Sequence, residues 1–348
     1  MELADSESHA CFMRELSHIF LNDKKGGIMK AFLRLMTGIC IGFVLVFPLS
    51  LSAAYPERAI TYTIPFNPGG ESDVTARLQE PHLEEILGVS VNVTHKPGGG
   101  GAVAWSEFQR TAQPDGYWVV GCNIPHIIGQ PALRKNAGYE TDGMKVVMWF
   151  HFTPNVLVVS KDSKYKTLKD FIDDAGKNPY AFTVGGSGTY SANHLDTLRL
   201  NKAAGIELTY VPYTGTGPVI PALMGGHLKA AMSYSMVSVQ YKDKFRTLAV
   251  ASEERVPAMP DVPTFKEQGY DIIGGAYRGI AVPLGTPQAV VDRLADAFTK
   301  ANQKITAKQE DLGFIMTYAT GDQAKVLVDK MKMAYGDVLE NIKRKQKQ

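Results

Sequence analysis

Two kinds of hydrophobic pattern alternate along the chain. Short runs rich in β-branched and aromatic residues are separated by segments whose apolar residues recur at helical spacing. Strands that alternate with helices in this way indicate an α/β fold. The predicted strands are Ile60–Ile64, Val89–Val93, Tyr117–Gly121, Val156–Val159, Phe182–Val184, Leu208–Val211, Leu228–Met232, Leu248–Ala251 and Ile280–Val282.

Several helices are predicted from the residues at their ends. Thr167 is typical of an N-cap, and it precedes a helix over Leu168–Asn178 with one apolar face. Thr286-Pro287 predicts a second start, with Thr286 as the N-cap and a helix that reaches about Lys304. The last segment, Gln323–Lys345, predicts a long amphipathic helix.

The start of the chain has the order of features found in a secretory signal. Basic residues Lys30 and Arg34 precede the apolar run Leu35–Leu51, and the small residues Ser52–Ala54 follow. We therefore expect export with cleavage near Ala54, and a permanent membrane anchor is the alternative because the run is close to the lower length limit for a span. Residues 1–28 fit neither a signal nor a domain, and a true start at Met29 would explain them.

Composition excludes some classes of partner. The formal net charge is +2, which argues against nucleic acid or an anionic membrane surface as the main partner. Only Cys122 remains after the predicted cleavage, so we expect no internal disulfide and a buried, inert thiol.

Catalytic, metal and cofactor motifs are weak or missing in the sequence. No two histidines stand at metal-ligand spacing, and the pattern Gly99-x-Gly101-x-x-Ala104 fits a dinucleotide loop poorly because Pro97 separates it from the preceding strand. No nucleophile and base are fixed by a motif, so we expect no metal, no cofactor and no enzyme activity. Asn123 and His126 follow a strand end and are candidates to line a cleft.

A glycine-rich loop joins the first predicted strand to a helix predicted over Val74–Leu87. Open α/β sheets bind ligands at the carboxyl ends of strands, where helix N-termini present unpaired N–H groups that suit a carboxylate. Ser72 or Asp73 is expected to cap the helix. An ordinary capped turn is the alternative interpretation. The candidate binding residues of this loop are Phe66, Asn67, Pro68, Gly69, Gly70, Glu71, Ser72 and Asp73.

A second loop repeats the same design. It follows the strand-like segment Ala181–Val184 and leads into a helix over His194–Ala204. Its glycines and hydroxyls suggest a second anion-binding turn, and two such turns predict two lobes that face one ligand. Its candidate binding residues are Ser187, Gly188, Thr189, Tyr190, Ser191 and Asn193.

A series of motifs, in order, resembles the periplasmic receptors of tripartite tricarboxylate transporters, often called Bug receptors. The resemblance covers Tyr55 to Lys343. The motifs are Tyr55-Pro56, Pro65-Phe66-x-Pro68-Gly69-Gly70-x-x-Asp73, Lys96-Pro97-Gly98, Pro114-Asp115-Gly116-Tyr117, Gly186-Ser187-Gly188, His194-Leu195, Val211-Pro212-Tyr213-x-Gly215-x-Gly217-Pro218, Leu248-Ala249-Val250, Pro260-Asp261-Val262-Pro263-Thr264 and Ala281-Val282-Pro283-x-Gly285-Thr286-Pro287.

The resemblance implies a type II-like periplasmic binding protein with a ligand cleft between two α/β lobes. Lobe 1 is expected at 55–153 and 280–348, and lobe 2 at 154–279. The ligand is expected to be a small organic acid, delivered by a monomeric periplasmic receptor to transporter membrane subunits. A sensory subunit that presents its ligand to a membrane kinase or chemoreceptor is the alternative. By the same resemblance, Tyr213–Gly217 and the turn after Gly121 line the cleft, with Tyr213, Thr214 and Gly215 as further candidates.

Glu71 departs from the family pattern, which commonly has a small residue there. A carboxylate aimed at a carboxylate site repels the ligand at close range. Three interpretations are open: Glu71 points to solvent, pairs with an arginine such as Arg77 or Arg278, or contacts an ammonium or hydroxyl group of the ligand.

Overall fold

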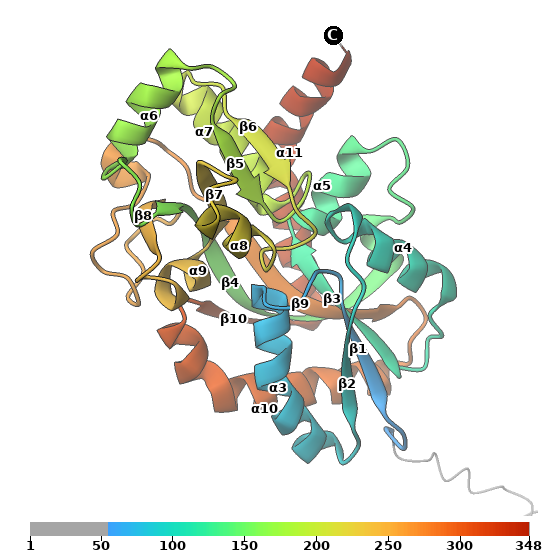
Figure 1. The fold of residues 1–348 in the computed structure, drawn as a ribbon. Coiled ribbons are helices and arrows are strands. Elements are labelled where there is room, and N and C mark those ends of the chain that lie inside the picture. The colour runs from blue at the N-terminus through green and yellow to red at the C-terminus, as the bar shows by residue number, and fades with distance from the viewer. Residues whose placement is uncertain (1–54, 348) are drawn as a thin grey trace, which may run out of the picture. The chain divides into compact units, whose positions relative to one another are not determined.

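The computed structural model describes residues 55–347, so the predicted signal at 29–54 and the segment 1–28 lie outside the described residues. Strands and helices alternate along the described chain, which confirms the α/β prediction (Figure 1). The strands are β1 (Ile60–Ile64), β2 (Val91–His95), β3 (Trp118–Ile124), β4 (Met144–Ser160), β5 (Thr183–Gly186), β6 (Thr209–Pro212), β7 (Ala230–Tyr234), β8 (Phe245–Val250), β9 (Gly275–Pro283) and β10 (Ile315–Thr320). The α-helices are α3 (Glu71–Leu87), α4 (Ala102–Thr111), α5 (His126–Leu133), α6 (Leu168–Lys177), α7 (Ala192–Ala204), α8 (Val219–Met224), α9 (Ser235–Gln240), α10 (Gln288–Asp311) and α11 (Gly321–Lys347).

One long strand, β4, is shared by two groups of strands. Its first part pairs with β9 and β10, and β9 continues through β3 to β1 and β2. Its second part pairs with β7 and β8, and β7 continues through β5 to β6. The change of partners occurs at Pro154 and Asn155: Pro154 still faces Gly275 of β9, whereas Asn155 faces Tyr234 of β7.

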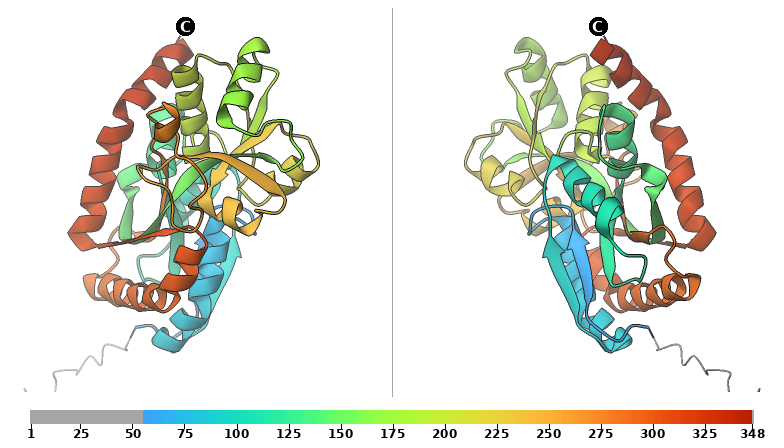
Figure 2. Two further views of the ribbon diagram at one scale, coloured as in Figure 1. Left: turned by 90° about the vertical axis from the view of Figure 1, so that its left-hand side faces the viewer. Right: turned by 90° about the vertical axis from the view of Figure 1, so that its right-hand side faces the viewer.

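Each group of strands has its own hydrophobic core. The larger core packs α3, α4, α5, α10 and α11 on the first group, with Trp105, Trp149 and Phe298 fully buried. Two smaller cores lie on the second group, one of them beneath α6 and α7. Helix α11 runs along one flank (Figure 2) and reaches α7, where the guanidinium carbon of Arg199 lies 5.0 Å from the ring centroid of Tyr335.

Local signals predicted some element ends correctly. Thr167 caps α6 through a capping box: its side chain accepts from the Asp170 N–H, and the Asp170 carboxylate accepts from the Thr167 N–H. Cys122 is buried as expected, and burial raises the pKa of its thiol.

Other predicted ends were wrong. Thr286 is not the N-cap of α10, because its hydroxyl donates to the Pro283 carbonyl oxygen at 2.8 Å and Pro287 occupies the cap position. The helix continues to Asp311, beyond the predicted end at Lys304. Neither Ser72 nor Asp73 caps α3, which begins at Glu71 with Gly70 as an N-cap that supplies no side-chain bond.

Candidate functional site

The loop between β1 and α3 places a helix N-terminus next to an internal pocket. Gly69 adopts φ 81°, a region that favours glycine, and its N–H donates to the Asp73 carboxylate at 2.9 Å. The other Asp73 oxygen lies 2.7 Å from Nε2 of His95. Asp73 therefore holds the loop in shape, while the first N–H groups of α3 have no acceptor within the helix. Together with the helix dipole, those groups favour a negatively charged ligand atom.

The pocket lies between side chains from both groups of strands. Its free space is about that of a single water molecule, so the loops fit closely around the polar side chains. The lining residues are Phe66, Asn67, Gly70, Glu71, Ser72, Asp73, Asn123, His126, Ser187, Thr216, Tyr234 and Arg278.

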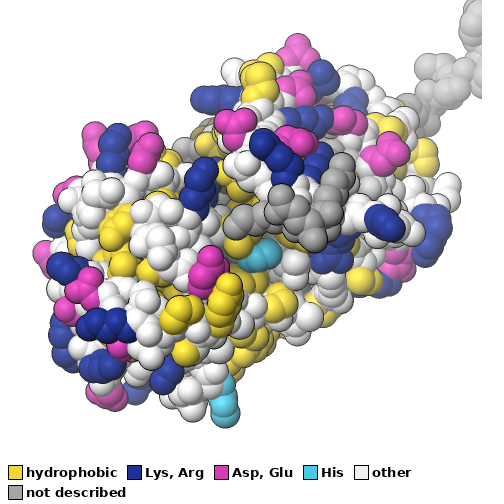
Figure 3. All heavy atoms as spheres, turned by 90° about the horizontal axis from the view of Figure 1, so that it is seen from above, with side chains coloured by type: hydrophobic (Ala, Val, Ile, Leu, Met, Phe, Trp, Pro, Cys, Tyr) yellow, Lys and Arg dark blue, Asp and Glu magenta, His cyan; other side chains and the backbone are white. Residues whose placement is uncertain are grey.

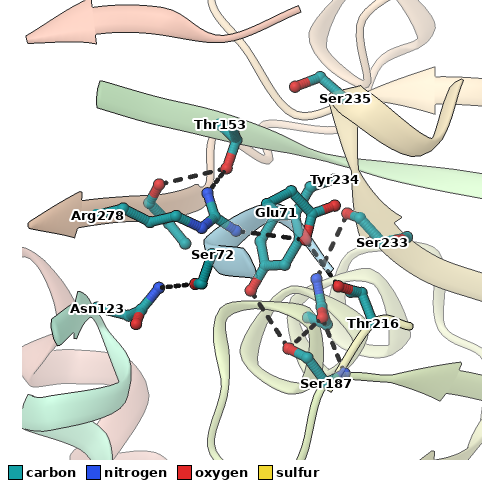
Figure 4. Close-up of polar contacts among 12 residues, drawn as sticks. Glu71, Ser72, Asn123, Thr153, Ser187, Thr216, Ser233, Tyr234, Ser235 and Arg278 are labelled. Carbon is teal, nitrogen blue, oxygen red and sulfur yellow. Dashed lines mark hydrogen bonds and ion pairs between the residues drawn. The ribbon is translucent and has the colours of Figure 1, made fainter. Parts of the chain in front are cut away.

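Glu71 is buried in this pocket, with 1% of its surface exposed, so the interpretation that it points to solvent is wrong. Its Oε2 atom accepts a hydrogen bond of 2.7 Å from the Thr216 hydroxyl and lies 3.6 Å from Nη2 of Arg278 (Figure 4). Arg77, the other arginine considered, is exposed and pairs with Asp73 and Glu80. The arginine partner of Glu71 is therefore Arg278.

Arg278 is the cation of the pocket, and it is held by neighbours on several sides. It lies on β9, is 3% exposed, and donates from Nη1 to the hydroxyl of Thr153. Its guanidinium carbon stands 4.6 Å from the ring centroid of Tyr234. Burial lowers the pKa of Arg278 from its usual value, and the negative charge of Glu71 opposes this change.

A chain of polar contacts crosses the other side of the pocket. Ser187 donates from Oγ to Oδ1 of Asn193 at 2.6 Å, so it is an acceptor for the Tyr234 hydroxyl at 3.3 Å. The Tyr234 oxygen also lies 3.5 Å from Nε2 of His126. Burial lowers the pKa of His126 to about 3, with a smaller contribution from Arg278, so its imidazole is neutral at physiological pH. These residues present neutral dipoles to the pocket.

The predicted binding residues of the first loop do not all reach the pocket. Phe66, Asn67, Gly70, Glu71, Ser72 and Asp73 line it, together with Asn123 and His126. Gly69 instead bonds within the loop, and Pro68 lies against Gly217.

Of the second loop, only Ser187 lines the pocket. Asn193 lies behind Ser187, and Ser191 caps α7 by accepting from the His194 N–H at 3.2 Å. Tyr190, with φ 61°, stacks on His194. Gly188 and Thr189 lie beside Gly100 and Gln130 of the first group.

Several contacts join the two groups of strands around the pocket. Asn67 N–H donates to the Thr214 carbonyl oxygen at 3.3 Å, and Gln130 donates to the Thr189 carbonyl oxygen at 2.7 Å. Gly215 lies so close to Phe66 that a Cβ added there would stand 3.2 Å from the Phe66 Cβ. The Tyr213 N–H donates to the Gly186 carbonyl oxygen at 2.8 Å, and this bond holds the loop after β6 to the loop after β5.

Three pocket residues were not candidates in their own right. Thr216 fell inside the segment Tyr213–Gly217 without being singled out, and Arg278 was considered only as a partner of Glu71. Tyr234 was missed, although it lies two residues after the predicted strand Leu228–Met232, and the carboxyl ends of strands are where ligands bind in such sheets.

The described residues 55–347 contain no group of three or more His, Cys, Asp or Glu side chains arranged to hold a metal ion. Within the same residues, no helix combines the length and the apolarity needed to cross a membrane.

Comparison with known proteins identifies the family. The model of the tripartite tricarboxylate transporter family receptor matches residues 75–342. The chain belongs to this family. A relative from Cupriavidus necator, described as the UPF0065 protein in the gbd 5′ region, is 32% identical over 248 residues, which are 71% of this chain and 75% of the relative.

Solved structures similar to this chain have the same fold. The periplasmic binding protein BugD is 29% identical with a TM-score of 0.77, covering 83% of this chain and 98% of its own. MatC from Rhodopseudomonas palustris, solved with bound malate, is 27% identical with a TM-score of 0.75, covering 82% and 100%. An R. palustris protein solved with adipate is 25% identical with a TM-score of 0.78, covering 83% and 98%. The prediction of a two-lobed periplasmic binding protein fold is confirmed, and the family consists of periplasmic solute-binding proteins rather than enzymes.

Proposed function

We propose that this family receptor captures a small organic acid in the periplasm and delivers it to the membrane subunits of a tripartite tricarboxylate-type transporter. The observation that carries the proposal is the position of the α3 N-terminus at a pocket closed by loops from both groups of strands. N–H groups at a helix N-terminus suit a carboxylate, and closure removes the ligand from water.

The predicted lobes, 55–153 with 280–348 and 154–279, give this closure a mechanical basis. Strand β4 runs through both groups, and the loop contacts at Asn67–Thr214 and Gln130–Thr189 join one group to the other. We propose that these contacts form when the lobes close on the ligand. The malate and adipate found in two related structures support a carboxylate as the ligand class.

We propose that the pocket residues of both loops, together with Asn123, His126, Thr216 and Tyr234, contact the ligand. The remaining predicted residues, among them Ser191 and Asn193, hold those residues in place through the bonds described above.

Thermal denaturation and calorimetric titration against a panel of mono-, di- and tricarboxylic acids test the ligand class. A ligand that binds only the folded state raises the free energy of unfolding by RT ln(1 + [L]/Kd), and the melting temperature rises with it. We expect at least one acid to do so, and its neutral carboxamide to have no effect. Failure of every acid in the panel would contradict the proposal. Uptake of the bound acid by proteoliposomes that contain the transporter membrane subunits, with and without this protein, tests delivery.

A further inference from the structure

The pocket has an unusual balance of charge for a carboxylate site. Its charged lining residues are Glu71, Asp73 and Arg278. Asp73 is compensated outside the pocket, because Nε of Arg77 lies 3.6 Å from its oxygen Oδ1. Glu71 and Arg278 compensate each other at 3.6 Å. No further cation lies among the described residues that line the pocket. A ligand with two carboxylates would therefore bring two negative charges to a pocket whose one guanidinium is already shared with Glu71.

Acidic and basic side chains are interspersed over the face shown in Figure 3, without a large field of one sign on that face. At an effective dielectric constant of about 20, like charges repel roughly four times more strongly than in bulk water. The pocket residues therefore set the charge that a ligand can carry.

Hydrogen-bonding atoms without partners point to the complementary chemistry. Among the described residues, Oε1 of Glu71 and Oδ1 of Asn67 are buried acceptors with no partner, and Nδ1 of His126 is also unpaired. Nε of Arg278 is a buried donor with no partner. A buried polar atom left without a partner is costly, and such an atom at a binding site is commonly satisfied by the ligand.

These atoms belong to residues that line one pocket. The donors are Nε of Arg278 and the first N–H groups of α3, and they suit a carboxylate. The acceptors are the Glu71 carboxylate and the Asn67 amide oxygen, and they suit a group with several N–H donors and a positive charge. Figure 4 shows the Glu71 carboxylate between Arg278 and Thr216, inside the polar cluster rather than turned away from it.

We propose that the ligand is a zwitterion that carries an ammonium group as well as a carboxylate, as amino acids do, and that Glu71 determines this specificity. The inference rests on the proposed function and names its substrate class. The ammonium group bonds to Oε1 of Glu71, while Oε2 keeps its bonds to Thr216 and Arg278. A ligand with one ammonium group and one carboxylate has no net charge, which suits a pocket whose own charges are paired.

Calorimetric titration with three matched series tests the inference: propionate, lactate and alanine; succinate, malate and aspartate; glutarate, 2-hydroxyglutarate and glutamate. Within each series only the substituent changes, from hydrogen to hydroxyl to ammonium. In the series that fits the pocket, we expect the amino acid to bind at least tenfold more tightly than both counterparts, about 1.4 kcal/mol at 25 °C. If, for example, succinate or malate binds as tightly as aspartate or more tightly, the inference is overturned and the proposed function is left intact.

Two variants assign the preference to Glu71. Glu71→Gln keeps the shape and removes the charge, and we expect the preference for the ammonium group to fall by about tenfold. Thr216→Val is the matched control, because it removes a hydrogen bond to the same carboxylate and keeps the charge. It is expected to weaken all ligands together. An unchanged preference in Glu71→Gln overturns the role of Glu71. If that variant does not fold, the order of affinities within the matched series, measured on the unsubstituted protein, decides the ligand class. Failure of every acid, amino acids included, contradicts the proposed function instead.

Discussion

Gly217→Ala tests whether the contact between the two loops forms only on closure. Gly217 lies in the loop before α8 and faces Pro68 in the loop before α3. A Cβ added at Gly217 would overlap the Pro68 carbonyl oxygen and would stand 3.4 Å from its carbonyl carbon and 3.6 Å from that of Gly69. These are all backbone atoms, so no side-chain rotation relieves the overlap. The Gly217 backbone is not in the left-handed region, so alanine fits there when the loops are apart.

The expected magnitude follows from that geometry. Overpacking by one methyl group costs about 1–3 kcal/mol when neighbours are fixed. Here the cost applies only to the closed form, because the overlap disappears when the loops separate. If binding requires closure, the affinity for the ligand falls by about 5- to 150-fold, and the free energy of unfolding of the ligand-free protein is nearly unchanged.

Calorimetry with a ligand found in the acid panel measures the affinity, and small-angle scattering measures whether the liganded variant is less compact. Gly336→Ala on α11 is the control, since a Cβ there meets nothing within 4 Å and should leave the affinity unchanged. An affinity of Gly217→Ala within twofold of the parent, with equal compactness, would refute the closure argument.

Three further predictions concern stability and reactivity. Burial lowers the pKa of His126 to about 3, so between pH 6.5 and 3 the folded protein binds fewer protons at this residue than the unfolded chain does. The contribution of neutral His126 to the free energy of unfolding is therefore lost as pH falls through this window. From pH 7.5 to pH 5 we expect denaturant titrations to show a loss of about 2 kcal/mol more in the parent than in His126→Phe, and parallel losses would contradict this. Arg199→Met should lower the free energy of unfolding by about 3–5 kcal/mol, because it leaves the buried Asp196 carboxylate, 2.9 Å away, without its cation; a loss under about 1 kcal/mol would show that the pair is not needed. In the mature chain, Cys122 should react with a thiol reagent only after denaturant is added, and rapid labelling of the native protein would contradict its burial.

Features that depend on neighbouring residues in the sequence were predicted well. Helix α6 follows from the Thr167 cap and a single apolar face, and β1 was predicted with its observed bounds. The strand β4 was predicted only at Val156–Val159, although it begins at Met144. Pro154 has no N–H to donate to a ladder and normally marks a break in a central strand, but here it lies where β4 exchanges its partners. Strand β10 was missed, because it is an edge strand with a mixed pattern and pairs only with β4.

The sequence by itself determined the α/β class, the family and the two glycine-rich loops, because turn residues, caps and hydrophobic periods are local properties. It left the role of Glu71 open, since no local rule says which distant residue a side chain meets. Only the tertiary structure decided that Glu71 is buried against Arg278 and Thr216, and that the Thr214–Gly217 segment packs on the first loop. Strand pairing and the shared strand β4 bring these residues together. Because the pocket is buried, each charge and each unpaired polar atom in it affects which ligand binds.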